Sequence, residues 1–205
     1  MRRKPQQLRS REMVDKLIDA TGKVIVARGL EYATTNHIAE EAGVNIASLY
    51  HYFGNKEEMI EALQDRLTQD LLQTLVVHAA GYDLKALSMR DIAETSILFT
   101  LQSLRADPVF MELSRHWSRL SLQRSMAVIE QHLLQLCTAY FRQHFRTYPI
   151  EDLHIRLYVL LNGAMATVAR HLCEGSPVIR DRDLVAVLAD MIVGVLEKGM
   201  IEEAC

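Results

Sequence analysis

The sequence predicts an all-α protein, with a module of short helices near its N-terminus and a larger helical bundle after it. Glycine and proline are scarce, at 9 and 4 of 205 residues. Apolar residues recur every three or four positions almost throughout, which is the spacing of helices that bury one face. No segment shows the strict apolar–polar alternation of a half-buried strand.

The first helix is expected over residues 10–28, because Gly29 follows it and glycine readily adopts the positive φ that ends helices. Two short helices follow in the segments TTNHIAEEAG and NIASLYHYF. We expect Thr34 or Thr35 to cap the first and Asn45 to cap the second. The apolar face of the first helix is predicted to consist of Val14, Leu17, Ile18, Thr21, Val24 and Ile25.

A longer connecting helix begins after Asn55, with Glu58 three residues on, a spacing typical of the capping box. It is expected to reach about residue 79, with Leu71, Leu72, Leu75 and Val76 directed into the bundle. Prolines separate most of the later helices, which are predicted over residues 88–106, 108–118, 119–146, 150–174 and 182–199.

Charge is distributed unevenly along the chain, whose formal net charge is -3. Residues 1–28 carry eight Lys or Arg and three Asp or Glu, a balance of 8 − 3 = +5, so the remainder carries -8. Such asymmetry indicates an N-terminus that faces a polyanion. The three cysteines are widely spaced and form no CxxC pair, which favours a reducing, cytoplasmic setting without a disulfide framework.

Several classes of protein do not fit the sequence. The sequence contains no long uncharged apolar run of the kind that a membrane span or an export signal requires. A di-metal carboxylate site needs two E-x-x-H pairs, and the chain has one, Glu151 with His154, at an expected helix start. There is also no H-E-x-x-H, G-x-S-x-G or P-loop motif. We therefore expect no enzymatic activity, catalytic residue, metal or cofactor.

The two short helices form a helix-turn-helix pattern, with Ala39 small enough for close packing and Gly43 at the turn. In that geometry Leu49 and Phe53 face inward, and the start and opposite side of the second helix face the major groove. Tyr50, His51 and Tyr52 then surround a helix too short to bury them all. Their hydroxyl and imidazole groups are suited to bind phosphate oxygens.

The spacing of these residues resembles the N-terminal motif of the tetracycline-repressor (TetR) family of bacterial regulators. The matching elements are Gly29, Thr34-Thr35, Ile38-Ala39, Ala42-Gly43-Val44, Leu49 to Phe53 and Asn55 to Glu58, across residues 10–65. The resemblance implies phosphate contacts by Thr35, Ser48, Tyr50, Tyr52 and Lys56. It implies base contacts by Asn36, Ile46 and Ala47, where Ile46 replaces the Lys or Gln frequent in the family.

The last two expected helices carry broad apolar stripes, which exceed what one small domain needs. By resemblance they form a dimer interface, and burial within the single chain is the alternative. The predicted interface residues are Leu157, Leu161, Met165, Val168, Leu188, Met191 and Val195. The helices between are expected to hold an apolar or amphipathic effector against Phe99, Trp117 and Tyr140, unless these aromatics only fill the core.

These interpretations divide the chain into a basic flexible tail (1–9), a helix-turn-helix DNA-binding domain (10–55), a connecting helix (56–80) and an effector-binding and dimerisation domain (81–205). The predicted function is that of a homodimeric transcriptional regulator, a repressor, that binds a pseudo-palindromic duplex DNA operator and is released by an unidentified small molecule. The alternative keeps the DNA-binding domain and makes the C-terminal body a docking surface for another protein.

Overall fold

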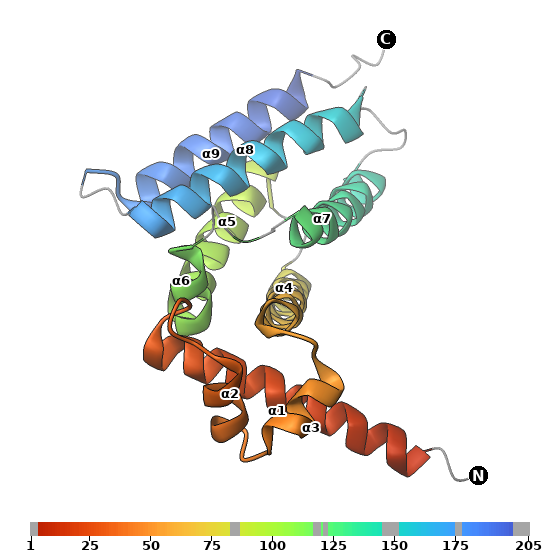
Figure 1. Ribbon diagram of the computed structural model, residues 1–205. Helices are drawn as coiled ribbons and strands as arrows, with labels where there is room; N and C mark the ends of the chain where they lie inside the picture. Colours follow the sequence, from red (N-terminus) through yellow and green to blue (C-terminus); the bar gives the residue numbers. More distant parts are fainter. Residues whose placement is uncertain are drawn as a thin grey trace, which may run out of the picture. The chain divides into compact units, whose positions relative to one another are not determined.

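The computed structural model describes residues 4–82, 87–116, 120, 123–144, 152–174 and 178–198, and all regular secondary structure within these ranges is helical. The predicted all-α class is therefore confirmed. The helices are α1 (Lys4–Arg28), α2 (Thr35–Glu41), α3 (Ile46–Tyr52), α4 (Lys56–Ala80), α5 (Met89–Ala106), α6 (Pro108–Ser114), α7 (Gln123–His144), α8 (Leu153–Glu174) and α9 (Asp181–Glu197) (Figure 1).

Two element boundaries differ from the sequence prediction. Residues 4–9, expected as a flexible tail, belong to α1, because glutamine, leucine and arginine extend a helix already formed by the packed residues after them. Helix α6 ends at Ser114, before the predicted residue 118, and the described part of α7 runs from Gln123 to His144 within the predicted range 119–146. The other helices begin and end within a few residues of expectation.

The chain forms two compact units, and their boundaries differ from the expected domains. The N-terminal unit contains Met1–Gln69 and Asp107–Leu120, and the helical body contains Asp70–Ala106 and Ser121–Cys205. The division falls inside α4 rather than at either of its ends. α6 belongs to the N-terminal unit, although the segments before and after it in sequence belong to the body.

The core of the N-terminal unit is built on one face of α1. Leu17, Thr21 and Ile25 are completely buried, and the Thr21 hydroxyl donates to the Leu17 carbonyl at 2.7 Å, which satisfies its buried polar group. The other helices add fully or almost fully buried side chains to this core: Ile38 from α2, Leu49 from α3, and Met59 and Leu63 from α4. The predicted apolar face of α1 is confirmed, with Val14 at its partly buried edge.

Helix α6 packs on α1 in the same unit. Gly22 of α1 is buried, and a Cβ at that position would lie 3.3 Å from the Val109 side chain, so glycine permits a close approach of the two helices. Leu113 completes the contact from the far end of α6. The start of α6 is capped by Asp107, which accepts from the backbone of Val109 and Phe110.

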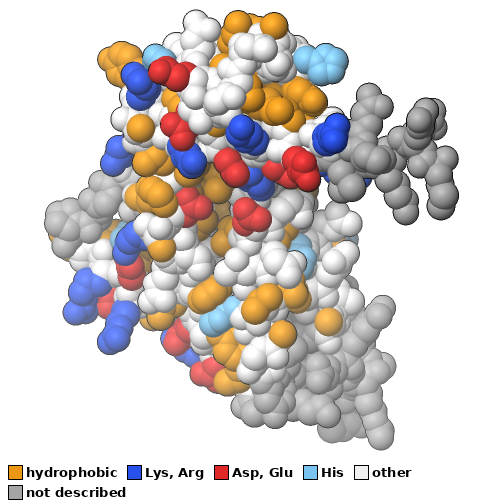
Figure 2. Space-filling view, turned by 90° about the horizontal axis from the view of Figure 1, so that it is seen from below, with side chains coloured by type: hydrophobic (Ala, Val, Ile, Leu, Met, Phe, Trp, Pro, Cys, Tyr) orange, Lys and Arg blue, Asp and Glu red, His pale blue; other side chains and the backbone are white. Residues whose placement is uncertain are grey.

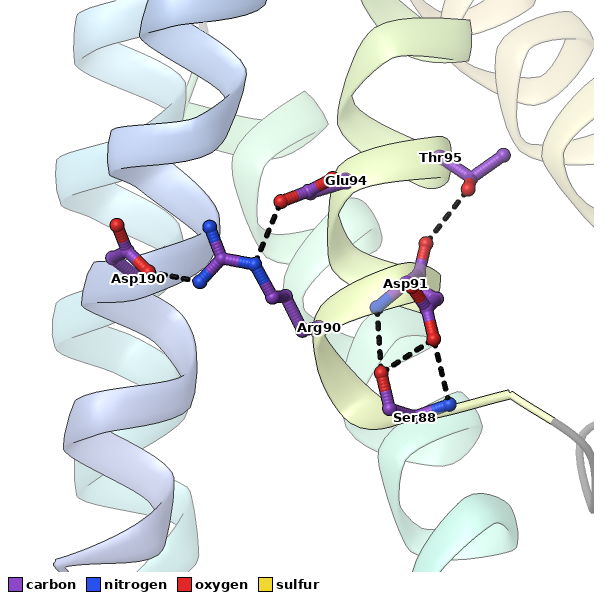
Figure 3. A network of polar contacts seen from close by, with 6 residues as sticks. All are labelled: Ser88, Arg90, Asp91, Glu94, Thr95 and Asp190. Carbon is purple, nitrogen blue, oxygen red and sulfur yellow. Dashed lines mark hydrogen bonds and ion pairs between the residues drawn. The ribbon is translucent and has the colours of Figure 1, made fainter.

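The body is held together by α5, α8 and α9. Its buried cluster includes Leu153, Leu157 and Leu160 of α8 and Leu196 of α9. Arg90 of α5 pairs with Asp190 of α9 and, at 2.9 Å, with Glu94 one turn along its own helix (Figure 3). Ser88 and Asp91 cap the start of α5 beside this pair, and their hydrogen bonds lower the pKa of Asp91.

A second polar cluster joins the same three helices around Asp181, at the start of α9. Its carboxylate accepts from Arg105 of α5 at 2.5 and 3.1 Å and lies 2.8 Å from Nε2 of His171 on α8. The His171 side chain is only 8% exposed. Hydrogen bonds from Arg105, and then from His171, lower the pKa of Asp181. This cluster therefore stabilises the folded body when the carboxylate is ionised.

We expect Asp181→Asn to lower the free energy of unfolding by about 1–3 kcal/mol near neutral pH, because a neutral amide accepts more weakly from charged donors. The pKa is lower in the folded state, so the carboxylate's stabilisation is present above its unfolded pKa and lost as pH falls through the folded one. Urea unfolding at several pH values should show the two proteins converging in acid.

Asp183→Asn is the matched control, since Asp183 lies on the exposed side of α9 and bonds Arg180 three residues earlier. We expect a smaller loss from this local pair than from one that joins three helices. Equal losses in the two variants would show that the Asp181 cluster contributes nothing beyond an exposed ion pair.

Candidate nucleic-acid interface

A side chain caps the start of each short helix, and Gly43 lies in the turn between them. Thr34 is extended and accepts from the His37 backbone at 3.2 Å, and Asn45 accepts from the Ser48 backbone at 2.7 Å. Between them Gly43 has φ +60, and a Cβ at that position would meet no heavy atom within 4 Å, so backbone conformation rather than space requires glycine. Both predicted caps are confirmed, with Thr34 rather than Thr35 capping α2.

Helix α3 turns one side inward and leaves the other accessible. Leu49 is completely buried and Phe53, directly after the helix, is 7% exposed. Tyr50 is 51% exposed, His51 is exposed, and Tyr52 packs partly against the core with its ring edge-on to His51. The run of rings in the sequence therefore divides into inward, edge and outward positions around two helical turns.

A hydrogen bond joins two predicted phosphate-binding residues. The Thr35 hydroxyl at the start of α2 lies 3.1 Å from the Tyr50 hydroxyl on α3. Each hydroxyl retains further hydrogen-bonding capacity, since a hydroxyl has one donor and two acceptor sites. The contact places two polar groups from different helices together and restricts the rotamer of an exposed tyrosine. Sequence analysis predicted both residues but not their contact.

Lys56, the predicted phosphate-binding cation at the start of α4, already forms one hydrogen bond within the fold. Its ammonium donates to the Leu30 carbonyl at 3.2 Å, and the side chain is half-buried. Glu58 is also engaged: its carboxylate accepts from the Gly54 backbone at 2.7 Å, while its own N–H donates to Asn55 at 2.8 Å. Asn55 therefore caps α4 as predicted, and the Glu58 carboxylate reaches back to Gly54, one residue before the cap. Two ammonium hydrogens of Lys56 remain for another acceptor.

The other predicted DNA-binding residues lie on these same helices. Asn36 and Ala47 are exposed, and Ser48 is half-buried. Ile46, predicted to contact bases, packs in part against the core, so only the remainder of its side chain is accessible. The exposed caps Thr34 and Asn45 adjoin the predicted set, and sequence analysis had treated them only as helix caps.

Of the three predicted effector residues, only Phe99 has a side chain within the described part of the chain. Phe99 of α5 is half-buried and stacks on His78 of α4, with ring centroids 3.6 Å apart and an interplanar angle of 7°. The Tyr82 hydroxyl bonds the His78 ring, and burial raises the pKa of Tyr82. Trp117 and the side chain of Tyr140 lie outside the described residues. Val76, expected to enter the bundle, is 39% exposed.

The predicted dimer residues separate into two groups. Leu157 and Leu188 are 5% and 4% exposed within the single chain, so little of either side chain is left for a partner. Leu161 and Val195 also pack against the body's own cluster, whereas Met165 and Val168 are half-buried and Met191 is 37% exposed. A different set of large apolar residues is exposed on α8 and α9: Ile155, Tyr158, Val159 and Val187, together with Met191.

The large exposed apolar residues of α8 follow one helical stripe. Ile155, Tyr158 and Val159 are 51%, 56% and 59% exposed, and the same side continues through exposed Gly163 and Ala166. These positions recur at three- and four-residue intervals, which places them on one face. We call this set the α8 stripe.

The described residues contain no group of three His, Cys, Asp or Glu side chains placed to hold a metal ion. Burial raises the pKa of Cys137 to about 11, so its thiol is a poor metal ligand and nucleophile. Within the same ranges, no helix is both long and apolar enough to cross a membrane.

Comparison with known proteins gives a consistent result. Residues 17–63 match the family model described as bacterial regulatory proteins, tetR family. The chain is 32% identical over 80 residues to the HTH-type transcriptional regulator PksA of Bacillus subtilis (strain 168), covering 39% of this chain and 38% of PksA. It is 26% identical over 184 residues to the HTH-type transcriptional regulator BetI of Escherichia coli (strain K12), covering 86% and 89%.

Solved structures share the fold. The crystal structure of the transcriptional regulator FadR from Bacillus subtilis, in complex with stearoyl-CoA, superposes with a TM-score of 0.60 at 19% identity. The match covers 88% of this chain and 96% of FadR. The N-terminal helix-turn-helix and the C-terminal helical body are therefore arranged along the chain as in known regulators.

We expect Tyr50→Phe to weaken binding to duplex DNA by about 2–10-fold, the effect of losing one hydrogen bond at an exposed site. The thermal unfolding midpoint should hardly change, because the ring stays and the lost bond to Thr35 is exposed. Fluorescence anisotropy with a labelled duplex measures the affinity. Tyr32→Phe, at a tyrosine that is 74% exposed in the same unit, is the control. Equal affinities for wild type and Tyr50→Phe would remove the Tyr50 hydroxyl from the interface.

Proposed function

This chain belongs to the tetR family of bacterial regulatory proteins, and from that premise we propose that it is a cytoplasmic, homodimeric repressor released from its operator by a small molecule. The matched family and the relatives are DNA-binding transcriptional regulators and not enzymes. The observation that carries the proposal is α3, a helix anchored by Leu49 that leaves polar groups accessible beside the cap of α2.

The proposed DNA contacts fall into two classes. The first class binds phosphate oxygens and consists of Thr35, Ser48, Tyr50, Tyr52 and Lys56, with His51 beside them. Such contacts position the protein without reading sequence. Asn36, Ile46 and Ala47 approach the base edges in the major groove. Of these three only Asn36 carries a hydrogen-bonding side chain, so much of the preference comes from apolar contact with thymine methyl groups and from DNA shape.

The proposed dimer uses the α8 stripe with Val187 and Met191 of α9. Their exposure supports a partner contact, because contiguous exposed apolar side chains mark interaction surfaces. Gly163 and Ala166 lie within the stripe, and small side chains permit helices to approach closely. A twofold dimer presents two copies of α3, as a pseudo-palindromic operator requires.

The proposed effector is apolar or amphipathic and binds in the helical body. Phe99 and His78 form a stacked aromatic pair there, next to Tyr82. The related FadR binds stearoyl-CoA, which is an amphipathic molecule. The second candidate function, docking of a protein partner on the body, keeps the same DNA-binding unit and needs no enclosed ligand.

We expect Val159→Asp to give monomers with reduced operator affinity, because a carboxylate cannot be buried unpaired at an interface without a cost of several kcal/mol. The residue is 59% exposed in the single chain, so the fold itself should persist. Sedimentation velocity measures the assembly and circular dichroism the helicity.

Val77→Asp is the control for that variant, since Val77 is 64% exposed on α4 and lies away from the α8 stripe in sequence. It should sediment as wild type does. Dimers of unchanged stability from Val159→Asp would place the interface on another surface.

The effector hypothesis is tested by linkage. A coupling free energy of about 1–3 kcal/mol corresponds to about 5–150-fold weaker operator binding with ligand present, and the operator must weaken ligand binding by the same factor. We expect a long-chain acyl-CoA, used as the first probe in calorimetry, to bind less tightly when the protein is saturated with a selected operator.

The Phe99→Ala variant provides the matched comparison in the same titration. It should weaken acyl-CoA binding and leave operator binding unchanged in the absence of ligand. If no acyl-CoA or other amphipathic probe binds the body, or if binding is the same with and without operator, docking of a protein partner becomes the better account.

A further inference from the structure

The two short helices carry almost no positive charge. Residues 29–55 contain Glu31, Glu40 and Glu41 but neither lysine nor arginine. Lys56, the next residue, already donates to the Leu30 carbonyl. On the face seen in Figure 2, Lys and Arg side chains are interspersed with Asp and Glu and do not form one basic field. The short helices therefore supply little of the charge on which affinity for the phosphate backbone depends.

Positive charge is concentrated instead at the beginning of the chain. Five cations, namely Arg2, Arg3, Lys4, Arg9 and Arg11, precede the first acid, Glu12. The side chains of Arg9 and Arg11 are exposed, and among the described residues neither forms an ion pair with a carboxylate. Two other cations of this unit form ion pairs within the fold, since Lys23 lies 3.4 Å from Glu41 and Arg66 lies 2.7 Å from Asp19.

From Lys4 onward the basic segment belongs to α1. Met13 packs against the core cluster, whereas Arg9 and Arg11 before it are exposed. The helix from Lys4 to Met13 spans about 13 Å at 1.5 Å per residue. In Figure 1 this end of α1 continues past α3. The exposed Arg9 and Arg11 thus lie on a part of α1 that extends past the short helices.

We infer that residues 4–11, which we call the N-terminal arm, form a second DNA contact that binds backbone phosphates flanking the base pairs met by α3. The inference rests on the proposed function and adds a source for its affinity. Duplex DNA carries a charge about every 1.7 Å along its axis, so an arm of this length lies opposite several phosphates. Arginine is well suited to the contact, because its guanidinium pairs with two phosphate oxygens at once.

The arm and α3 have separable effects on binding. Phosphate contacts carry no sequence information directly, so the arm determines general affinity and salt dependence, and α3 determines which sequence is preferred. Lys4 also lies in the first turn of α1, which contains no acid, and a cation at this end of a helix is unfavourable. A nearby polyanion relieves this arrangement.

The test uses the full-length Arg9→Gln/Arg11→Gln variant and a long duplex of mixed sequence. Log affinity falls linearly with log salt, and each lost phosphate contact makes this fall less steep by about 0.9. Loss of two arginines should therefore make it less steep by about 1.8 per protomer. Affinity at physiological salt should fall on the order of tenfold or more, by the same relation. The unfolding midpoint should not change, since both residues precede the packed part of α1.

Lys23→Gln/Arg28→Gln is the control of equal formal charge. It removes two exposed cations at the other end of the same helix, of which Lys23 lies 3.4 Å from Glu41, and it should leave the salt slope near that of wild type. A second measurement compares a selected operator with and without flanking base pairs. Wild type should lose affinity when the flanks are removed, and Arg9→Gln/Arg11→Gln should lose none.

The outcomes separate the inference from the proposed function. If wild type binds DNA but Arg9→Gln/Arg11→Gln keeps its slope and its dependence on flanks, the arm contact is wrong and the regulator assignment stands. Equal losses in the two double variants would show a general charge effect, which also overturns a local contact. If wild type binds neither mixed-sequence duplexes nor any selected from a random pool, the inference and the proposed function both fail.

Discussion

The burial of Leu49 determines which side chains α3 leaves accessible. A helix as short as α3 is not stable alone, so it forms because Leu49 and Phe53 insert into a core already built on α1 and because Asn45 caps its first turn. Those inward positions leave Tyr50 and His51 outside. The hydrogen bond between Tyr50 and Thr35 then ties the outer side of α3 to the start of α2. Recognition therefore depends on the rigidity of an apolar contact beneath it.

Features that depend on local sequence were predictable, and those that depend on tertiary contacts were not. The caps at Asn45 and Asn55 were predicted because a cap and its N–H partner lie three residues apart. The bond from Lys56 to the Leu30 carbonyl spans 26 residues, and nothing in either segment indicates it. The same limit applies to α6, whose packing on α1 follows from the fit between Gly22 and Val109.

The apolar stripes of α8 and α9 show a second limit of sequence patterns. Periodicity identified both helices as broadly apolar, but it does not separate a face buried within the chain from one available to a partner. The structure makes that separation, since Leu157 and Leu188 are buried whereas Tyr158, Val159 and Val187 are exposed. A helix that buries one face and still exposes large apolar residues on another has more apolar surface than a single chain covers.

The chain crosses between the N-terminal unit and the helical body at three points, after Gln69, Ala106 and Leu120. The first is α4, an uninterrupted helix that begins in one unit and ends in the other. The second is the junction of α5 and α6, where Arg105 bonds Asp181 only two residues before Asp107 caps α6. Only Asp107 lies between α5 and α6, and α6 packs closely on α1, which belongs to the core that holds α3. The proposed release by a small molecule therefore requires a ligand that distinguishes two arrangements of this connection, since a ligand shifts an equilibrium only by its differential affinity for the two states.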